Sequence, residues 1–196
     1  YNKHNLAVAK FAATGGAREE LTGVLFTKEK TAATDSFRLL EVSVDSNLKV
    51  EDYPKTPQGG SVMRGCKPFI VPAKALAEIK IPKSSKAAPV LESVAIKYLD
   101  DKRVDFITTN LEAADVKTAR CIDAKFPDYS EIFPKHEPLA EMLINGELLA
   151  ELVKVMSELN KELKIKFYGK EKPVVIECGS ATQKARGMIM PIRDDR

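Results

Sequence analysis

The sequence predicts an α+β protein built from repeated half-domains, each a helix followed by antiparallel strands. One observation is a helical segment, Leu76-Ala77-Glu78-Ile79, that matches Leu149-Ala150-Glu151-Leu152. A second is that the strand-like segments 94–98 and 163–167, which follow these helices, align without a gap. Because one such unit has an apolar helix face and an apolar sheet face and cannot bury both alone, we expect paired units with helices on one face and antiparallel sheets outside.

The first copy of the unit is the least regular and occupies residues 1–44. Residues 6–13 are predicted to form a helix that a Thr-Gly-Gly sequence ends. Residues 21–26 have the composition of a strand. The Thr, Asp and Ser side chains at 34–36 can bond their own backbone, which favours a tight bend. Residues 37–42 then resume an extended pattern as the returning strand of a hairpin.

The second copy begins with a short strand at 69–71, after a connection at 51–67 that is rich in Pro, Gly and polar residues. Pro72 suits the first turn of a helix, which is predicted over 73–79. The remaining expected elements are a basic loop at 81–89 and strands at 94–99, 104–108 and 119–123.

The third copy contains the most regular helix. Its apolar residues over 148–159 form one stripe along the helix. Strands are predicted at 163–167, 173–177 and 187–190. In the repeat, 173–176 aligns with 104–107, and 187–190 aligns with 119–122.

Composition indicates a soluble globular protein, since 44% of the 196 residues are apolar and 30% are charged. No apolar run approaches the roughly 20 residues that span a bilayer, and the sequence shows no secretory signal, so we expect no membrane partner. Three cysteines without a CxxC pair favour reduced thiols in the cytoplasm and no zinc site. The net charge of +3 does not by itself indicate nucleic-acid binding.

No catalytic constellation stands out in the sequence. It has no glycine-rich phosphate loop, no histidine with a matching base and no metal-ligand spacing. The two histidines, His4 and His136, are expected at the surface. The pairs Asp100-Asp101 and Asp194-Asp195 are better explained as turn and tail residues. We therefore expect a protein that is not an enzyme and that has no cofactor and no metal.

Five motifs, in order along the chain, resemble those of the bacterial DNA sliding clamp, the beta subunit of DNA polymerase III. The motifs are Leu21-Thr22-Gly23-Val24-Leu25-Phe26, Ala33-Thr34-Asp35-Ser36-Phe37-Arg38-Leu39, Val71-Pro72-Ala73-Lys74-Ala75-Leu76, Ile122-Asp123-Ala124-Lys125-Phe126-Pro127-Asp128-Tyr129 and Met190-Pro191-Ile192-Arg193. The resemblance implies the DNA-clamp fold. Residues 1–134 are similar to the family's middle domain, and 142–196 to the second half of its last domain, with a linker at 135–141.

The resemblance implies a processivity factor that tethers DNA polymerase and other replication and repair proteins to double-stranded DNA. The implied location is the cytoplasm, in association with the nucleoid. A family member has three such domains and closes a ring as a head-to-tail dimer, whereas the first domain and half of the last have no counterpart in this sequence. A homo-oligomer therefore stays open, as does an alternative function: a clamp-derived peptide-binding module or regulator that does not encircle DNA.

The resemblance also implies a pocket that binds a short partner peptide between the middle and last domains. Methionine, leucine and proline would make a deformable apolar floor, and two arginines a polar rim. Without the resemblance, the same residues would be interpreted as core and C-terminal strand residues. The pocket residues are Thr34, Ser36, Phe37, Arg38, Leu39, Pro134, Pro173, Met188, Met190, Pro191, Ile192 and Arg193.

Contacts to double-stranded DNA are implied for basic residues on or beside helices. Such contacts would be independent of base sequence and sensitive to salt. Glu19 and Glu20 oppose them in the loop that carries Arg18, because carboxylates repel phosphate. Without the resemblance, each lysine would be interpreted as a solvated surface charge. The DNA-binding candidates are Arg18, Lys74, Lys10, Lys80, Lys83, Lys86, Lys154 and Lys161.

Overall fold

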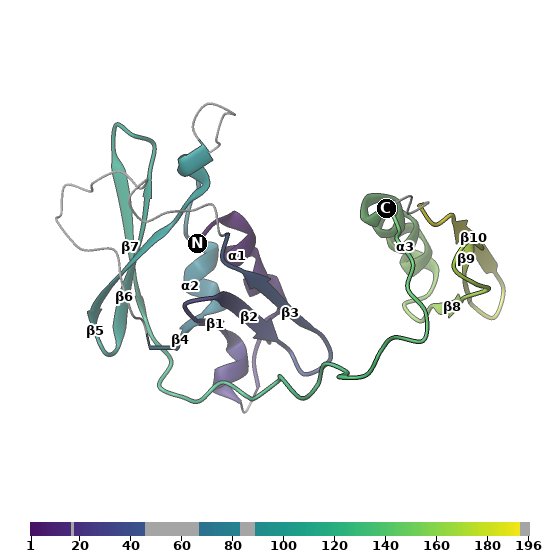
Figure 1. Ribbon diagram of the computed structural model, residues 1–196, viewed down its shortest axis with the longest axis horizontal. Helices are drawn as coiled ribbons and strands as arrows, with labels where there is room; N and C mark the ends of the chain where they lie inside the picture. Colours follow the sequence, from purple (N-terminus) through teal and green to yellow (C-terminus); the bar gives the residue numbers. More distant parts are fainter. Residues whose placement is uncertain (17, 46–66, 83–88, 193–196) are drawn as a thin grey trace. The chain divides into compact units, whose positions relative to one another are not determined.

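The structure is a computed structural model that describes residues 1–16, 18–45, 67–82 and 89–192 (Figure 1). The chain divides into two compact units, unit 1 (residues 1–128) and unit 2 (residues 129–196). Both units combine helices with antiparallel sheets, so the predicted α+β class is confirmed. Most of the predicted connection at 51–67 and of the basic loop at 81–89 lies outside the described residues.

The first half of unit 1 consists of short helices and three strands. These are α1 (Lys3–Ala7), the 3-10 helices η1 (Val8–Phe11) and η2 (Glu19–Thr22), and the strands β1 (Gly23–Phe26), β2 (Lys30–Thr34) and β3 (Leu39–Ser43). The helix predicted over 6–13 is wrong at both ends. It begins earlier because the Asn2 side chain accepts hydrogen bonds from the amides of His4 (3.0 Å) and Asn5 (3.3 Å). Its last turn tightens to a 3-10 helix that ends at Phe11.

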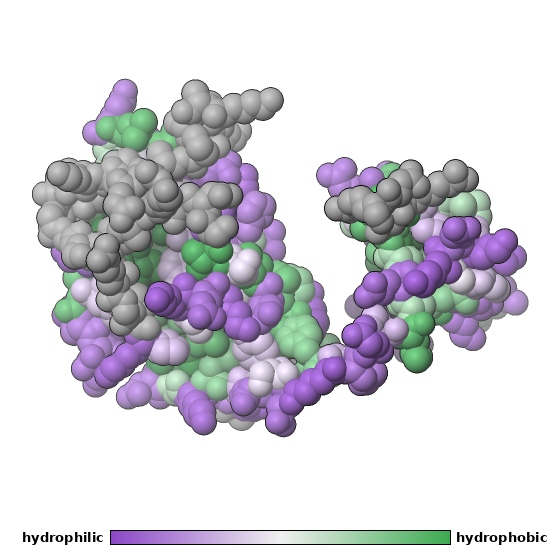
Figure 2. Space-filling model, viewed as in Figure 1, coloured by the Kyte–Doolittle hydropathy of each residue, from purple (hydrophilic) through white to green (hydrophobic). Residues whose placement is uncertain are grey.

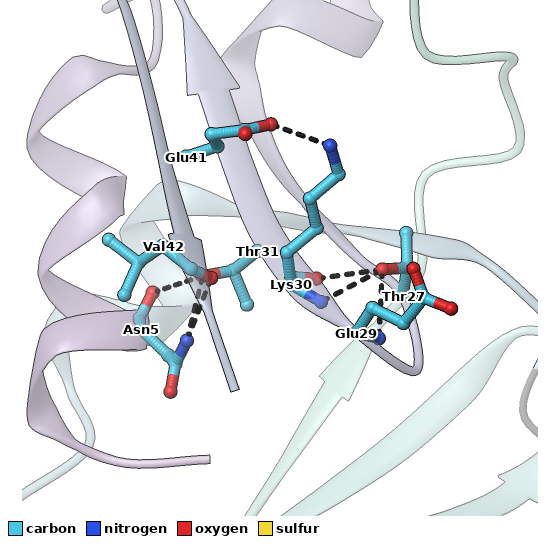
Figure 3. Close-up of polar contacts among 7 residues, drawn as sticks. All are labelled: Asn5, Thr27, Glu29, Lys30, Thr31, Glu41 and Val42. Atoms are coloured by element: carbon cyan, nitrogen blue, oxygen red, sulfur yellow. Dashed lines mark hydrogen bonds and ion pairs between the residues drawn. The ribbon is translucent and has the colours of Figure 1, made fainter. Parts of the chain in front are cut away.

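A buried asparagine joins the first helix to the sheet (Figure 3). Asn5 Nδ2 donates hydrogen bonds of 3.1 Å to the carbonyl of Val42 and of 3.1 Å to that of Ser43. Thr31 Oγ1 donates one of 3.1 Å to the carbonyl of Asn5. Because Asn5 and Thr31 are fully buried, these bonds replace the water that the polar groups have lost and fix the helix against the hairpin.

The second half of unit 1 begins with a strand that precedes its helix. Its elements are β4 (Phe69–Pro72), α2 (Ala73–Ala77), the 3-10 helix η4 (Pro89–Glu92), β5 (Ala95–Asp100), β6 (Arg103–Thr109) and β7 (Ala114–Arg120). The helix predicted over 73–79 is α-helical only as far as Ala77. The strand predicted at 119–123 is wrong in its position. A tight turn, in which Asn110 Oδ1 accepts a hydrogen bond of 2.7 Å from the amide of Ala113, returns the chain earlier, and β7 then pairs with β6 along its whole length.

The two halves of unit 1 share one core. The sheets have the strand orders β3-β2-β1-β4 and β5-β6-β7, so β4 of the second half pairs with β1 of the first half. In this pairing Phe69 lies opposite Phe26, and their rings stack with centroids 5.2 Å apart. Phe106 of the second half packs edge-on against Phe26 at 5.6 Å. The aromatic core therefore forms only when both halves are present.

Over its described residues, 129–192, unit 2 has one α-helix and one sheet. The helix is α3 (Gly146–Leu159), and the strands are β8 (Lys164–Lys166), β9 (Val174–Gly179) and β10 (Lys184–Ile189), in the order β10-β9-β8. The predicted helix over 148–159 is confirmed. It begins at Gly146 because the Asn145 side chain accepts hydrogen bonds from the amides of Glu147 (2.9 Å) and Leu148 (3.1 Å).

Backbone pairing confirms the predicted repeat between the second half of unit 1 and unit 2. The amide of Ile122, after β7, donates a hydrogen bond of 2.8 Å to the carbonyl of Ile70, before α2. The amide of Ile192, after β10, donates one of 2.8 Å to the carbonyl of Leu143, before α3. In both copies, the segment after the last strand thus pairs with the segment before the helix.

The pairing corrects the alignment of the last two strands in this repeat. By register, Ile176 takes the place of Phe106, and Ile189 takes the place of Ala119. All four side chains are buried, which supports this correspondence. The sequence alignment had set Val175 against Phe106 and Gly187 against Ala119. It was wrong because it did not follow which residue of each strand faces the helix layer.

Candidate peptide-binding and DNA-binding residues

The predicted pocket residues of unit 1 gather on the turn between β2 and β3. Thr34 Oγ1 donates a hydrogen bond of 2.9 Å to the carbonyl of Arg38 and accepts one of 3.1 Å from the amide of Ser36. Asp35 Oδ1 accepts hydrogen bonds of 3.0 Å from the amide of Phe37 and 3.0 Å from that of Arg38. Ser36 has a φ of 77°, a left-handed conformation that these bonds hold in place. The predicted tight bend at 34–36 is confirmed.

Arg38 is anchored on three sides. Its Nε lies 2.9 Å from Asp35 Oδ2, and a terminal guanidinium nitrogen donates a hydrogen bond of 3.3 Å to the carbonyl of Lys10. The guanidinium carbon lies 4.9 Å from the centroid of the Phe11 ring, within cation–π range. The hydrogen bond from Arg38, followed by that from the Phe37 amide, lowers the pKa of the Asp35 carboxyl. The turn is therefore fastened to η1, and its geometry is largely fixed before any ligand binds.

The apolar side chains of this turn differ in exposure. Phe37 is 97% exposed at the tip, whereas Leu39 is half-buried at the start of β3. A single exposed apolar side chain is common on protein surfaces, so the exposure of Phe37 does not by itself mark a binding surface. Figure 2 shows hydrophobic residues that reach the surface of each unit between hydrophilic ones.

In unit 2, the predicted pocket residues Met188, Met190 and Ile192 form an exposed apolar stripe along and just after β10. Their exposed fractions are 63%, 55% and 46%. Gly187 and Ile189 alternate with them; Ile189 is buried, and a Cβ at Gly187 would lie 2.7 Å from a leucine side chain of α3. The alternation turns both methionines away from the helix layer and toward solvent.

The other predicted pocket residues lie in different surroundings. Pro191 is half-buried beside the stripe. Pro173 is half-buried just before β9, at the end of the sheet where Ile189 pairs with Val174. Pro134 is exposed on a segment without helix or strand. Arg193 lies outside the described residues. The structure thus groups Thr34, Ser36, Phe37, Arg38 and Leu39 at the β2–β3 turn, and Met188, Met190, Pro191 and Ile192 along and just after β10, while Pro134 lies apart from both groups.

The DNA-binding candidates of unit 1 are exposed side chains on or near short helices. Lys10 lies on η1 and Lys74 on α2, two elements that pack against each other. Lys80 follows α2. Arg18 Nε lies 2.9 Å from Glu20 Oε1, so this arginine is already paired with a carboxylate. The predicted candidates Lys83 and Lys86 lie outside the described residues.

The charge on α3 is unfavourable for phosphate. The helix carries Glu147, Glu151 and Glu158 and a single basic residue, Lys154. Lys154 lies three residues after Glu151 and four before Glu158, positions that neighbour it on a helix surface. Lys161 is exposed beyond the helix. Sequence reasoning judged each lysine alone and therefore missed the excess of acid around Lys154.

A cleft of about 780 Å³ in unit 1 was not predicted from the sequence. Leu25 of β1 and Phe69 of β4 line one part of it, and Cys121 and Phe126, after β7, line another. Burial is the main cause that raises the pKa of the Cys121 thiol, so this cysteine is poorly suited to act as a nucleophile. Part of the motif at 122–129 lines the cleft. This motif is the feature of the sequence that could have indicated it.

Two further features concern metal and membrane binding. Within the part of the chain that the structure describes, no group of three or more His, Cys, Asp or Glu residues could hold a metal ion. Over the same residues, the helices are too short or too polar to cross a membrane.

Comparison with solved structures identifies the fold as that of a DNA clamp. The chain is similar to the DNA polymerase III beta subunit of Borrelia burgdorferi, with a TM-score of 0.64 and 18% identity over 95% of this chain and 44% of that one. The subunit of Pseudomonas aeruginosa gives 0.62 and 20% identity over 93% and 46%. A putative beta subunit of Eubacterium rectale gives 0.65 and 16% over 100% and 50%.

These matches confirm the resemblance to the bacterial DNA polymerase III beta subunit and the clamp fold that it implied. The chain spans about half the length, or less, of these clamp chains. No family model matches the sequence, and no curated protein matches it. The comparisons therefore establish the fold.

Proposed function

We propose that the chain is a sliding-clamp-type processivity factor, a non-catalytic protein that tethers polymerase-type partners to double-stranded DNA in the cytoplasm. The observation that carries the proposal is the similarity of at least 93% of the chain to DNA polymerase III beta subunits, at TM-scores above 0.6 in three bacteria. The β2–β3 turn supports the proposal. Its geometry is fixed by its own hydrogen bonds, and it carries the residues for which the clamp resemblance implies peptide binding.

In this proposal a partner peptide contacts two surfaces. One is the turn and strand start at Thr34–Leu39, and the other is the stripe of Met188, Met190 and Ile192. The methionines offer flexible, polarizable contacts that adapt to different apolar anchors. The turn supplies a rigid frame, since the bonds of Asp35 and Thr34 fix its backbone. The combination suits recognition of short apolar motifs in several partners.

Calorimetry with a peptide of the glutamine-x-x-leucine-phenylalanine type tests this proposal. We expect a dissociation constant of roughly 1 μM, or about −8 kcal/mol, for the native chain. Leu39→Asp and Met190→Asp each place a charge on one of the two surfaces and should weaken binding at least about tenfold. Leu111→Asp in unit 1 and Tyr168→Asp in unit 2 are matched controls on exposed apolar residues elsewhere. Equal affinity for all five proteins would refute the peptide-binding assignment.

DNA contact is proposed for the basic residues of unit 1, with Lys10 and Lys74 as the principal pair. They lie on neighbouring elements and are exposed. Lys80, Arg18, Lys83 and Lys86 are secondary contacts of unit 1 in this proposal. Lys154 and Lys161 are secondary contacts of unit 2, and the glutamates of α3 weaken the contribution of Lys154. Binding would depend on charge and not on base sequence.

A second candidate function is a clamp-derived peptide-binding module that does not encircle DNA. The acidic surface of α3 and the Arg18–Glu20 ion pair favour it, because both reduce attraction to phosphate. The two candidates differ in one measurement. A module of the second kind binds the peptide but does not bind a labelled 30-base-pair duplex at low salt, whereas a clamp binds both.

A further inference from the structure

Unit 2 corresponds to one half of unit 1, and in unit 1 each half is packed against the other half. In unit 1, each half completes the other through two reciprocal strand contacts. β4 of the second half pairs with β1 of the first, with Val71 opposite Val24. At the other edge, Tyr1 and Val94 exchange backbone hydrogen bonds of 3.2 and 2.7 Å. In both contacts, the residues before a helix pair with the first strand after the helix of the other half.

Unit 2 carries both partners of such a contact. The residues before α3 are Met142, Leu143 and Ile144. They correspond to β4, because the carbonyl of Leu143 accepts a hydrogen bond from the amide of Ile192, as the carbonyl of Ile70 in β4 does from the amide of Ile122. The first strand after α3 is β8, which is an edge strand of its sheet. Unit 2 therefore has both the segment before its helix and the strand after it. In two copies related by a two-fold axis, the segment of each copy can pair with β8 of the other.

Exposure shows where the missing half would pack. Ile165 of β8 lies opposite buried Ile176 and faces the helix layer, yet it is 50% exposed. The residue in its place in the second half of unit 1, Ile96, is 5% exposed, and Phe26 of the first half is 0% exposed. The two halves of unit 1 and unit 2 all have a helix followed by this strand. In unit 1 the other half of the unit covers Ile96 and Phe26, whereas unit 2, over its described residues, has no second half to cover Ile165.

We propose that two copies of this chain associate through their unit 2 half-domains and build one complete two-half domain between them. Transferring the β4–β1 register to unit 2 sets Met142 opposite Ile165 of the second copy, as Phe69 is opposite Phe26. The next pair outward is Glu141 opposite Lys166, whose Nζ already lies 2.6 Å from Glu177 Oε2 within unit 2, so the register places this lysine between two carboxylates. This interface goes beyond the proposed function and does not depend on it.

Light scattering on the full chain at several concentrations is the first test. We expect a mass that approaches twice the 21.6 kDa of one chain. Ile165→Lys, at a half-exposed site that tolerates a lysine in the single chain, should raise the dissociation constant of the dimer at least about tenfold, because it buries an unpaired charge. Leu111→Lys in unit 1 is the control on an exposed apolar residue and should dimerise like the native chain.

A charge exchange tests the register. Glu141→Lys alone should weaken the dimer, and adding Lys166→Glu to the same chain should restore it. Oxidative cross-linking tests it in trans: a Met142→Cys chain mixed with an Ile165→Cys chain should form a disulfide dimer well above the background of the native cysteines. A Ser180→Cys chain, with its cysteine in the β9–β10 turn, should not replace either partner.

Three outcomes would overturn the proposal. The first is a monomer at every concentration, and the second is a dimer that Ile165→Lys and Glu141→Lys leave unchanged. The third is cross-linking that occurs equally with Ser180→Cys. Loss of peptide or DNA binding in an intact dimer would instead count against the proposed function, so the two failures are distinguishable.

Discussion

The carboxylate of Asp35 holds Arg38 at 2.9 Å and at the same time accepts hydrogen bonds from the amides of Phe37 and Arg38. One side chain thus fixes both the backbone of the β2–β3 turn and the guanidinium that packs over Phe11. The turn on which peptide binding is proposed therefore depends on a residue that the sequence analysis did not include among its pocket residues.

Asp35 should make the stability of unit 1 depend on pH. The hydrogen bonds from Arg38 and the Phe37 amide lower the pKa of Asp35 in the folded chain. A lowered pKa stabilises the fold above the unfolded pKa of about 3.9, and this contribution is lost as pH falls through the folded value. We expect Asp35→Asn to lower the melting temperature at pH 7 and to have a smaller effect at pH 3. An equal decrease at both pH values would contradict this explanation.

Substitution of Asn5 should destabilise unit 1 through unsatisfied carbonyls. Asn5→Leu removes the donor to the carbonyls of Val42 and Ser43, which stay beneath the helix. We expect a loss of about 1–3 kcal/mol in the free energy of unfolding, measured by urea titration. The adjacent, exposed His4 provides the control, since His4→Ala should change stability by less than about 0.5 kcal/mol. A neutral Asn5→Leu would show that the network contributes little.

Gly23 should not tolerate a side chain. A Cβ there would lie 2.8 Å from Ile122 Cδ1 and 2.9 Å from the carbonyl oxygen of Val71, and it would also meet Ile70. Because backbone cannot move aside as a side-chain end can, Gly23→Ala should cost about 1–3 kcal/mol. Gly15→Ala, where nothing lies within 4 Å, should be close to neutral. Thermal unfolding of both variants checks this, and similar melting temperatures would show that β1 and β4 are not so closely packed.

DNA binding should weaken when the basic pair of unit 1 is reversed. Lys10→Glu and Lys74→Glu should each lower the affinity for a duplex and reduce the slope of log K against log salt by about one. Lys170→Glu, an exposed lysine of the β8–β9 connection, should leave the slope unchanged. Fluorescence anisotropy over a salt series measures this slope. Identical slopes for all variants would remove Lys10 and Lys74 from the DNA contact.

Much of the architecture was predictable because periodicity and turn chemistry are local. The helix at 148–159 has one apolar stripe, and the bend at 34–36 has side chains that can bond their own backbone. The early start of β7 was missed because most of this strand is exposed and its residues alternate weakly. One of its polar residues, Thr118, is instead held by a hydrogen bond of 2.6 Å to Asp105 on β6, a partner that local reasoning cannot supply.

The candidate site was predictable only in part. The exposed Met188 on β10 and Met190 just after it followed from the resemblance and from the alternation of the strand. The acidic surroundings of Lys154 and the anchoring of Arg38 on Phe11 depend on which residues meet in three dimensions, and single-residue reasoning missed them.

The central claim is that the chain connects a partner peptide to DNA, and a bridging measurement tests it most directly. The glutamine-x-x-leucine-phenylalanine peptide is fixed to a sensor surface, the chain is added, and a 30-base-pair duplex follows at low salt. We predict that the surface captures the duplex only after the chain has bound, and that Met190→Asp abolishes the capture. A surface that binds the chain but never captures the duplex would contradict the account.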